Sequence, residues 1–223
     1  VVVLPRAQQA LQIGETIGGH VGFSGRGRAG YRDRTLQMQG GRHAGSICPD
    51  NLPSMTSHRF PNIGELIAAN GEYAVEFTGS DLQVAPTRRL AVVACMDSRM
   101  DIFALLGLGN GQAHVIRNAG GVVTDDVIRS LCLSQRALGT EEIILVHHTK
   151  CGVSGLDEAA LKAELEEEVG VKPSWSFEAF GDPHRDVVQS ARRLQRSPFL
   201  PNKDHISGFV YDVDTGLLER VDL

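Results

Sequence analysis

The chain has 223 residues, 42% of them hydrophobic, which suffices for one globular domain with a sizeable core. Its formal net charge of −5 argues against general binding of nucleic acid, and no stretch approaches the roughly 18 apolar residues of a membrane span. The apolar start from Val1 to Leu4 is too short for the core of a signal peptide. We therefore predict a cytoplasmic protein that binds neither nucleic acid nor a membrane.

Residues 1–54 lack the long periodic apolar segments of a folded domain. They are rich in glycine and arginine, as in the run Gly25-Arg26-Gly27-Arg28-Ala29-Gly30. Such a segment buries too little surface to offset the entropy that it loses on ordering. We predict that residues 1–54 are a disordered or non-native extension, that Met55 is the natural start, and that residues 55–223 form the domain. The alternative interpretation is an arginine–glycine arm that touches RNA or a partner protein.

Beyond this extension the predicted elements alternate between helices and strands. Ile63, Leu66 and Ile67 share one face of the first helix. Residues 89–94 and 142–147 are apolar runs, typical of strands that are buried on both faces. The alternation predicts an α/β fold with a central, mostly parallel sheet flanked by helices. The remaining predicted elements are helices over 101–106, 124–138, 156–169 and 183–195, strands over 113–117 and 206–211, and a last strand over 217–221 after a hairpin turn at Asp214-Thr215-Gly216.

Two short motifs at strand ends carry the chemistry. Cys95 follows the first buried strand, and His148 and Cys151 follow the third. Sites in parallel sheets form beyond the carboxyl ends of the strands, so these side chains could converge. Two thiolates and one imidazole suit Zn²⁺, and three protein ligands leave a fourth position open, as in catalytic zinc sites. Zinc lowers the pKa of a bound water to roughly 7 and so supplies a hydroxide nucleophile at neutral pH.

Asp97 and Arg99 stand two and four residues after Cys95. A carboxylate beside an arginine stays ionised and is held in one orientation. Asp97 could accept a hydrogen bond from the zinc-bound water, or it could occupy the fourth metal position and switch the enzyme off. Arg99 is not expected to lose its proton, so its predicted role is to hold Asp97.

Each of these residues also has a structural interpretation. A cysteine at a strand end is often a small buried hydrophobe, and Cys95 and Cys151 could instead form a disulfide or a redox pair. Cys132 lies in a helical pattern and is predicted to pack in the core. His147 is predicted to be a structural histidine rather than a neutral group that supports a metal ligand, and His114 is interpreted in the same way.

The motifs Cys95-Met96-Asp97-Ser98-Arg99 and His148-Thr149-Lys150-Cys151-Gly152 together resemble the signature of the β-class carbonic anhydrases. The segment from His114 to Gly121 is similar to the loop that this family carries between the two motifs. The resemblance covers roughly residues 55–223 and is strongest to the short bacterial branch. We find no counterpart of the Gln and aromatic residues that contact substrate in the plant-like branch.

This resemblance implies a lyase in which zinc hydroxide attacks CO₂, bicarbonate leaves and a proton is exported. Asp97 and Arg99 would orient the hydroxide, and Gly120 and Gly121 would let the backbone approach the substrate closely. The family forms dimers that often pair into tetramers, and the helix that begins near residue 62 would be an arm laid over the partner.

Two other functions stay open at this point. The same branch also resembles hydrolases of carbonyl sulfide and carbon disulfide, which use the same zinc triad on a sulfur analogue of CO₂. A zinc-binding protein without catalytic activity is the third alternative.

Overall fold

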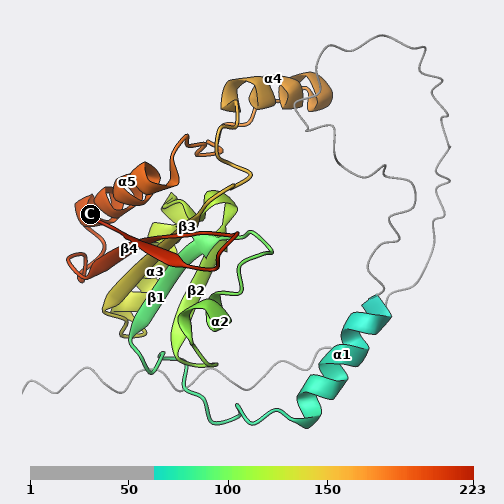
Figure 1. The fold of residues 1–223 in the computed structure, drawn as a ribbon, viewed down its shortest axis with the longest axis vertical. Coiled ribbons are helices and arrows are strands. Elements are labelled where there is room, and N and C mark those ends of the chain that lie inside the picture. Colours follow the sequence, from blue (N-terminus) through green and yellow to red (C-terminus); the bar gives the residue numbers. More distant parts are fainter. Residues whose placement is uncertain (1–62) are drawn as a thin grey trace, which may run out of the picture. The chain divides into compact units, whose positions relative to one another are not determined.

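The structure is a computed structural model that describes residues 63–223 (Figure 1). The predictions for residues 1–54, including the arginine–glycine arm and the start at Met55, lie outside the described residues. The described chain contains a five-stranded sheet in the order β2-β1-β3-β4-β5. Its strands are β1 (Leu90–Cys95), β2 (Ala113–Asn118), β3 (Glu142–His148), β4 (Ile206–Tyr211) and β5 (Leu218–Val221).

The sheet is mostly parallel, which confirms the predicted fold class. Strand β1 pairs in parallel with β2 and β3, and β3 pairs in parallel with β4. Only β5 is antiparallel, and it pairs with β4 across the predicted hairpin turn. Every residue of β1 is buried, because a central strand of such a sheet is covered on both faces.

Five α-helices accompany these strands in the described chain, at the places where the sequence predicts them. Thr124 begins α3 as predicted, with its side-chain oxygen accepting a hydrogen bond from the backbone N–H of Val127. Helix α3 ends two residues earlier than predicted, because Ala137 already caps it and Gly139 lies in the turn that follows. The helices are α1 (Ile63–Val75), α2 (Ile102–Leu106), α3 (Asp125–Arg136), α4 (Glu158–Val169) and α5 (Pro183–Arg196).

The two faces of the sheet carry separate apolar clusters. Helices α3 and α5 cover one face (Figure 1), where Leu131, Val187 and Leu194 are fully buried against the strands. Helix α2 contributes to the cluster on the other face, and this cluster includes Cys95 and Cys151. Two of the predicted metal ligands, Cys95 and Cys151, therefore belong to the second cluster, near the carboxyl ends of the strands.

Helix α1 forms as predicted, but its apolar face lacks a partner within the described chain. None of its 13 residues is buried, and Ile63, Leu66 and Ile67 are 68%, 61% and 66% exposed. Near its end the Tyr73 hydroxyl accepts a hydrogen bond from the Asn110 side chain at 3.3 Å. None of the described helices has the length and apolar character that a membrane crossing requires.

Candidate metal centre

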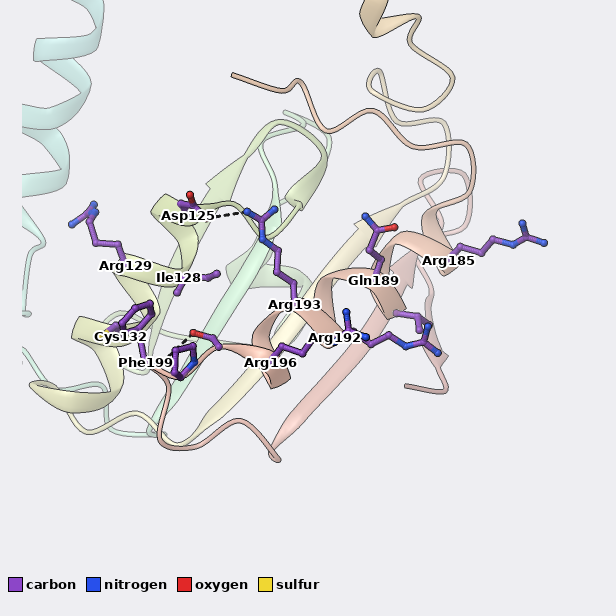
Figure 2. A pocket seen from close by; sticks show the side chains of 13 residues that line it. Asp125, Ile128, Arg129, Cys132, Arg185, Gln189, Arg192, Arg193, Arg196 and Phe199 are labelled. Atoms are coloured by element: carbon purple, nitrogen blue, oxygen red, sulfur yellow. Dashed lines mark hydrogen bonds and ion pairs between the residues drawn. The ribbon is translucent and has the colours of Figure 1, made fainter. Parts of the chain in front are cut away.

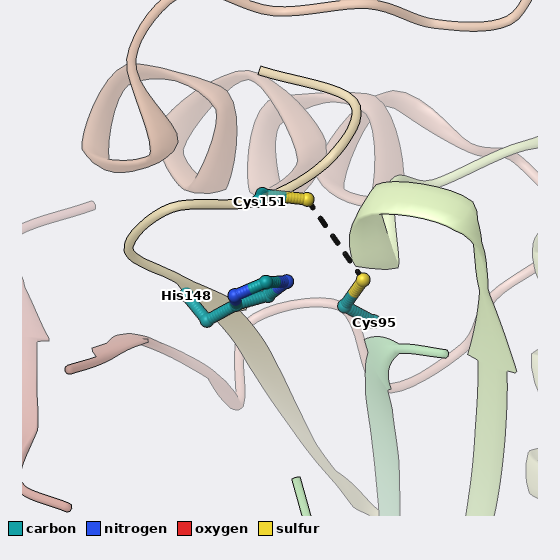
Figure 3. Close-up of side chains that lie close together, drawn as sticks. All are labelled: Cys95, His148 and Cys151. Carbon is teal, nitrogen blue, oxygen red and sulfur yellow. Dashed lines mark hydrogen bonds between the residues drawn. The ribbon is translucent and has the colours of Figure 1, made fainter. Parts of the chain in front are cut away.

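The three predicted ligands converge at one edge of the sheet (Figure 3). Cys95 is the last residue of β1 and His148 the last residue of β3, and these two strands are parallel neighbours. Cys151 returns to the same point because Lys150 adopts a left-handed backbone conformation with φ of 53°. The ligand atoms of the three buried residues all lie within 4.8 Å of one another.

The arrangement of these atoms fits a tetrahedral metal ion. The two sulfur atoms of Cys95 and Cys151 are 3.9 Å apart, close to the separation of about 3.8 Å expected for two thiolates at about 2.3 Å from one tetrahedral zinc. The same distance excludes the disulfide in this structure, since a disulfide has an S–S length of about 2.05 Å. The Nδ1 atom of His148 donates to the Thr149 carbonyl at 2.8 Å, which leaves its Nε2 atom buried without a partner in the described chain.

The electrostatics of the site favour a negatively charged sulfur next to the imidazole. The pKa of the Cys95 thiol is lowered to about 4, first because Cys151 hydrogen-bonds to it and then through His148 and the backbone N–H groups of Asp97 and Gly120. The Cys151 thiol has a raised pKa because it donates to Cys95. Burial disfavours the charged imidazole, yet contact with Cys95 outweighs it and raises the pKa of His148. A bound cation would take the place of the protons that these three groups share and would hold both sulfurs as thiolates.

Asp97 and Arg99 form the predicted pair at the edge of this site. Arg99 donates from Nε to Oδ1 of Asp97 at 2.9 Å and from Nη2 to Oδ2 at 2.7 Å. The same Nη2 also reaches the Lys150 carbonyl at 3.0 Å, which ties the two motif loops together. The Arg99 guanidinium holds the pKa of Asp97 well below its usual range. Asp97 is therefore a fixed, ionised acceptor beside the ligands.

Gly120 and Gly121 lie directly beside Cys95. Gly121 has φ of +72°, and a Cβ atom built on it would lie 2.7 Å from the backbone nitrogen of Cys95. Gly120 has φ of +81°, and a Cβ atom on it would meet the Phe180 ring at 3.1 Å. Both positions therefore need glycine, as the close approach of backbone to the site requires.

Three other predicted positions stand outside the ligand set. His147 is fully buried, and its Nε2 atom lies 2.7 Å from Oδ2 of Asp186, while its Nδ1 atom has no partner in the described chain. His114 makes a 2.7 Å hydrogen bond to Ser134. Cys132 packs against the cluster under α3 and α5. The contacts of all three side chains are those of structural residues, as the sequence predicts.

Sequence reasoning missed two groups that surround the site. Val153 and Phe180 pack against the apolar cluster that contains Cys95 and Cys151, although Phe180 lies in an irregular segment without a periodic signal. Arg117 donates two hydrogen bonds to the backbone of the loop between Cys95 and Asp97. Its position in a strand-like run gave no sign of this contact.

A family model, known proteins and solved structures were compared with the chain, and each comparison gives a match to carbonic anhydrases. A family model described as carbonic anhydrase matches residues 90–218. Beta-carbonic anhydrase 1 of Mycobacterium tuberculosis is 49% identical over 157 residues, which are 70% of this chain and 96% of that relative. Carbon disulfide hydrolase of Acidithiobacillus thiooxidans is 35% identical over 152 residues, 59% of this chain and 76% of the relative. The crystal structure of a carbonic anhydrase from Streptococcus mutans superposes with a TM-score of 0.68 at 41% identity, covering 72% of this chain and 97% of that one.

Proposed function

The chain belongs to the β-class carbonic anhydrases, and from this premise we propose that it is a zinc lyase that converts CO₂ reversibly to bicarbonate and a proton. Cys95, His148 and Cys151 would hold the zinc. The observation that carries this proposal is the buried Nε2 atom of His148, which accepts no hydrogen bond within residues 63–223 and lies within 4.8 Å of two sulfur atoms that are themselves 3.9 Å apart. Zinc bound there supplies Lewis acidity, which makes a hydroxide available at neutral pH.

Asp97 would orient the attacking oxygen. Its Oδ2 atom lies 3.7 Å from Nε2 of His148, so the carboxylate borders the position that a fourth ligand would take. An ionised carboxylate only accepts hydrogen bonds, and it would therefore fix the O–H direction and turn a lone pair toward the substrate. Arg99 would keep Asp97 in this role, whereas movement of Asp97 into the fourth position would give a resting state.

The substrate would lie against the apolar wall made by Val153 and Phe180. CO₂ is small and carries no net charge, so an apolar surface beside the nucleophile suits it. Gly120 and Gly121 would border this space, because their lack of a side chain lets the backbone approach the site closely.

Hydrolysis of carbon disulfide or carbonyl sulfide is the second candidate reaction. Relatives named carbon disulfide hydrolase share 32–35% identity with the chain, against 49% for the relatives named beta-carbonic anhydrase 1. Stopped-flow measurement of CO₂ hydration beside a sulfide-release assay separates the two. We expect fast CO₂ hydration at one zinc per chain, and rapid sulfide release with negligible CO₂ turnover would favour the second reaction. A zinc protein without activity on either substrate would be a binding protein.

We further propose a homodimer, which could pair into a tetramer, with α1 as the arm that each chain lays on its partner. An apolar groove of about 960 Å³ runs between α3 and α5 (Figure 2). Its apolar lining includes Ile128, Val188 and Phe199. Val188 of α5 is only half-buried because it lines this groove. The rim carries a surplus of positive charge, with one aspartate against five arginines: Asp125, Arg129, Arg185, Arg192, Arg193 and Arg196.

Helix α1 is complementary to this groove both in its apolar face and in its charge. Its exposed apolar face carries Ile63, Leu66 and Ile67, and it contains acidic residues but neither Lys nor Arg. Leu66→Asp together with Ile67→Asp should therefore shift the protein from dimer to monomer in analytical ultracentrifugation. Val84→Asp, at an equally exposed apolar residue outside α1, serves as the control, and a monomeric wild-type protein would refute the proposal.

Two remaining expectations from the sequence are proposals of the same kind. Residues 55–223 would form the catalytic domain, and the protein would be cytoplasmic. The family match within residues 90–218 supports the first. A shortened chain that begins at Met55 should keep the kcat of the full chain, and cell fractionation should recover the activity in the cytoplasm.

A further inference from the structure

A second arginine lies at the metal centre besides Arg99. Arg117 belongs to β2, the strand that pairs in parallel with β1 so that Arg117 lies opposite Ala94. Alternation along β2 places Arg117 on the same face as Ala113 and Val115, and these two residues pack against the apolar cluster that contains Cys95. The guanidinium therefore emerges at the carboxyl end of an otherwise apolar face, beside the candidate ligands.

The contacts of Arg117 are to backbone rather than to an acid. Its Nε atom donates to the carbonyl of Cys95 at 2.9 Å, and its Nη2 atom donates to the carbonyl of Asp97 at 2.6 Å. Within residues 63–223 it forms no ion pair, whereas Arg99 is paired with the carboxylate of Asp97. The two carbonyls flank Met96, whose backbone N–H donates to Asn118 of β2 at 2.8 Å.

Arg117 holds the loop from Cys95 to Asp97, which carries both a candidate metal ligand and the carboxylate beside it. Cys95 ends β1, so beyond it the chain no longer has a continuous ladder of strand hydrogen bonds. Arg99 holds the carboxylate of Asp97 through two side-chain hydrogen bonds. These two bonds do not hold the peptide groups of the loop from Cys95 to Asp97. Arg117 holds those peptide groups from the neighbouring strand β2, with two N–H donors of one rigid guanidinium.

We propose that Arg117 is a positioning residue, which sets the metal ligand Cys95 and the orienting carboxylate of Asp97 at a fixed separation. The proposal rests on the proposed function of the site, because it assigns Arg117 a task toward the zinc centre. Groups that orient metal ligands typically affect metal affinity or activity by about 10–100-fold when they are removed. The loss of Arg117 should fall in this range and should affect zinc affinity and kcat together.

Arg136 provides a matched control. It also donates to a backbone carbonyl, that of Phe199 at 2.8 Å, but it lies at the end of α3 and does not contact the candidate ligands. Arg117→Ala and Arg136→Ala thus remove the same side chain and the same kind of hydrogen bond. Only the first should change the metal centre.

The experiment uses the full chain with zinc and measures three quantities: zinc affinity by chelator competition, kcat with KM for CO₂, and the denaturation midpoint of the metal-free protein. Arg117→Ala should weaken zinc binding and lower kcat by about 10-fold or more each, with KM nearly unchanged. Added guanidinium ion at concentrations below those that denature the protein should restore part of kcat. Arg117→Lys, which keeps a donor and the charge, should give intermediate values.

Two results would overturn the proposal. One is wild-type zinc affinity and kcat in Arg117→Ala; the other is a loss that follows the denaturation midpoint alone, as in Arg136→Ala, without rescue by guanidinium. If Arg117→Ala does not fold, Arg117→Lys decides, since wild-type values in it would also refute the positioning role. Failure of the proposed function is distinguishable, because an inactive wild-type protein still reports the effect of Arg117 through zinc affinity.

Discussion

The Nε2 atom of His148 lies 3.7 Å from the Oδ2 atom of Asp97. This distance is too long for a hydrogen bond, yet it lets both atoms face one small ligand. Arg99 binds both carboxylate oxygens of Asp97 and so holds the carboxylate back from the imidazole. The geometry therefore supports Asp97 as a group that would accept a hydrogen bond from the fourth metal ligand without itself binding the metal.

The first prediction concerns the charge of Asp97. Asp97→Asn keeps the shape of the side chain but turns one acceptor oxygen into an N–H donor, so it can no longer accept from the attacking oxygen in the same geometry. We expect kcat for CO₂ hydration to fall by about 100-fold or more, while the zinc content stays at one ion per chain. Stopped-flow kinetics with metal analysis checks this, and Asp126→Asn, at an exposed residue paired with Arg129, is the control. An active Asp97→Asn protein would contradict the assigned role.

The second prediction concerns how pH affects the stability of the metal-free protein through Arg99. Arg99 lowers the pKa of Asp97 in the folded state, so the pair stabilises the fold above the unfolded pKa of about 3.9. This contribution is lost as pH falls through the lower folded value. The difference in free energy of unfolding between wild type and Arg99→Gln should therefore be constant above about pH 5 and shrink below about pH 4. Urea unfolding at a series of pH values measures it, and a difference that grows toward acid pH would be inconsistent with the pair.

The third prediction concerns the ionisation of Cys95. Because its pKa is lowered to about 4, Cys95 should be a thiolate at pH 7 in the metal-free protein and should take up a proton only near pH 4. Thiolate absorbance near 240 nm measures this titration. Cys151→Ala removes the group that hydrogen-bonds to Cys95 and should move the titration to higher pH, whereas Cys132→Ala should leave it unchanged. Absence of any thiolate signal at pH 7 in the wild-type protein would contradict the prediction.

The sequence predicted the parts of this site that depend on strand ends. Cys95 and His148 end two buried strands, and the rule that parallel strands present their carboxyl ends at one edge was enough to bring them together. The contacts of Arg117 could not be predicted, because they depend on the register between β1 and β2. The same holds for Phe180, which reaches the site from an irregular segment. The apolar stripe of α1 predicts a covering surface but not the chain that supplies it, and only the resemblance to the family suggested that this surface belongs to a partner.

The last prediction separates two effects of glycine at the site. Gly121 and Gly139 have nearly the same φ, +72° and +73°, but a Cβ atom on Gly121 would lie 2.7 Å from the Cys95 nitrogen, and one on Gly139 would meet nothing within 4 Å. Gly139→Ala should therefore cost only the left-handed conformation, about 1–2 kcal/mol. Gly121→Ala adds a collision with the backbone of β1, which raises the expected loss to about 3 kcal/mol or more.

Urea unfolding of the metal-free proteins measures both losses. Because the collision falls on the residue that carries a candidate ligand, Gly121→Ala should also weaken zinc binding in chelator competition, while Gly139→Ala should bind zinc as the wild type does. Equal stability losses in the two variants would mean that β1 moves aside at little cost, and the close approach of Gly121 to Cys95 would then not be what holds the ligand in place.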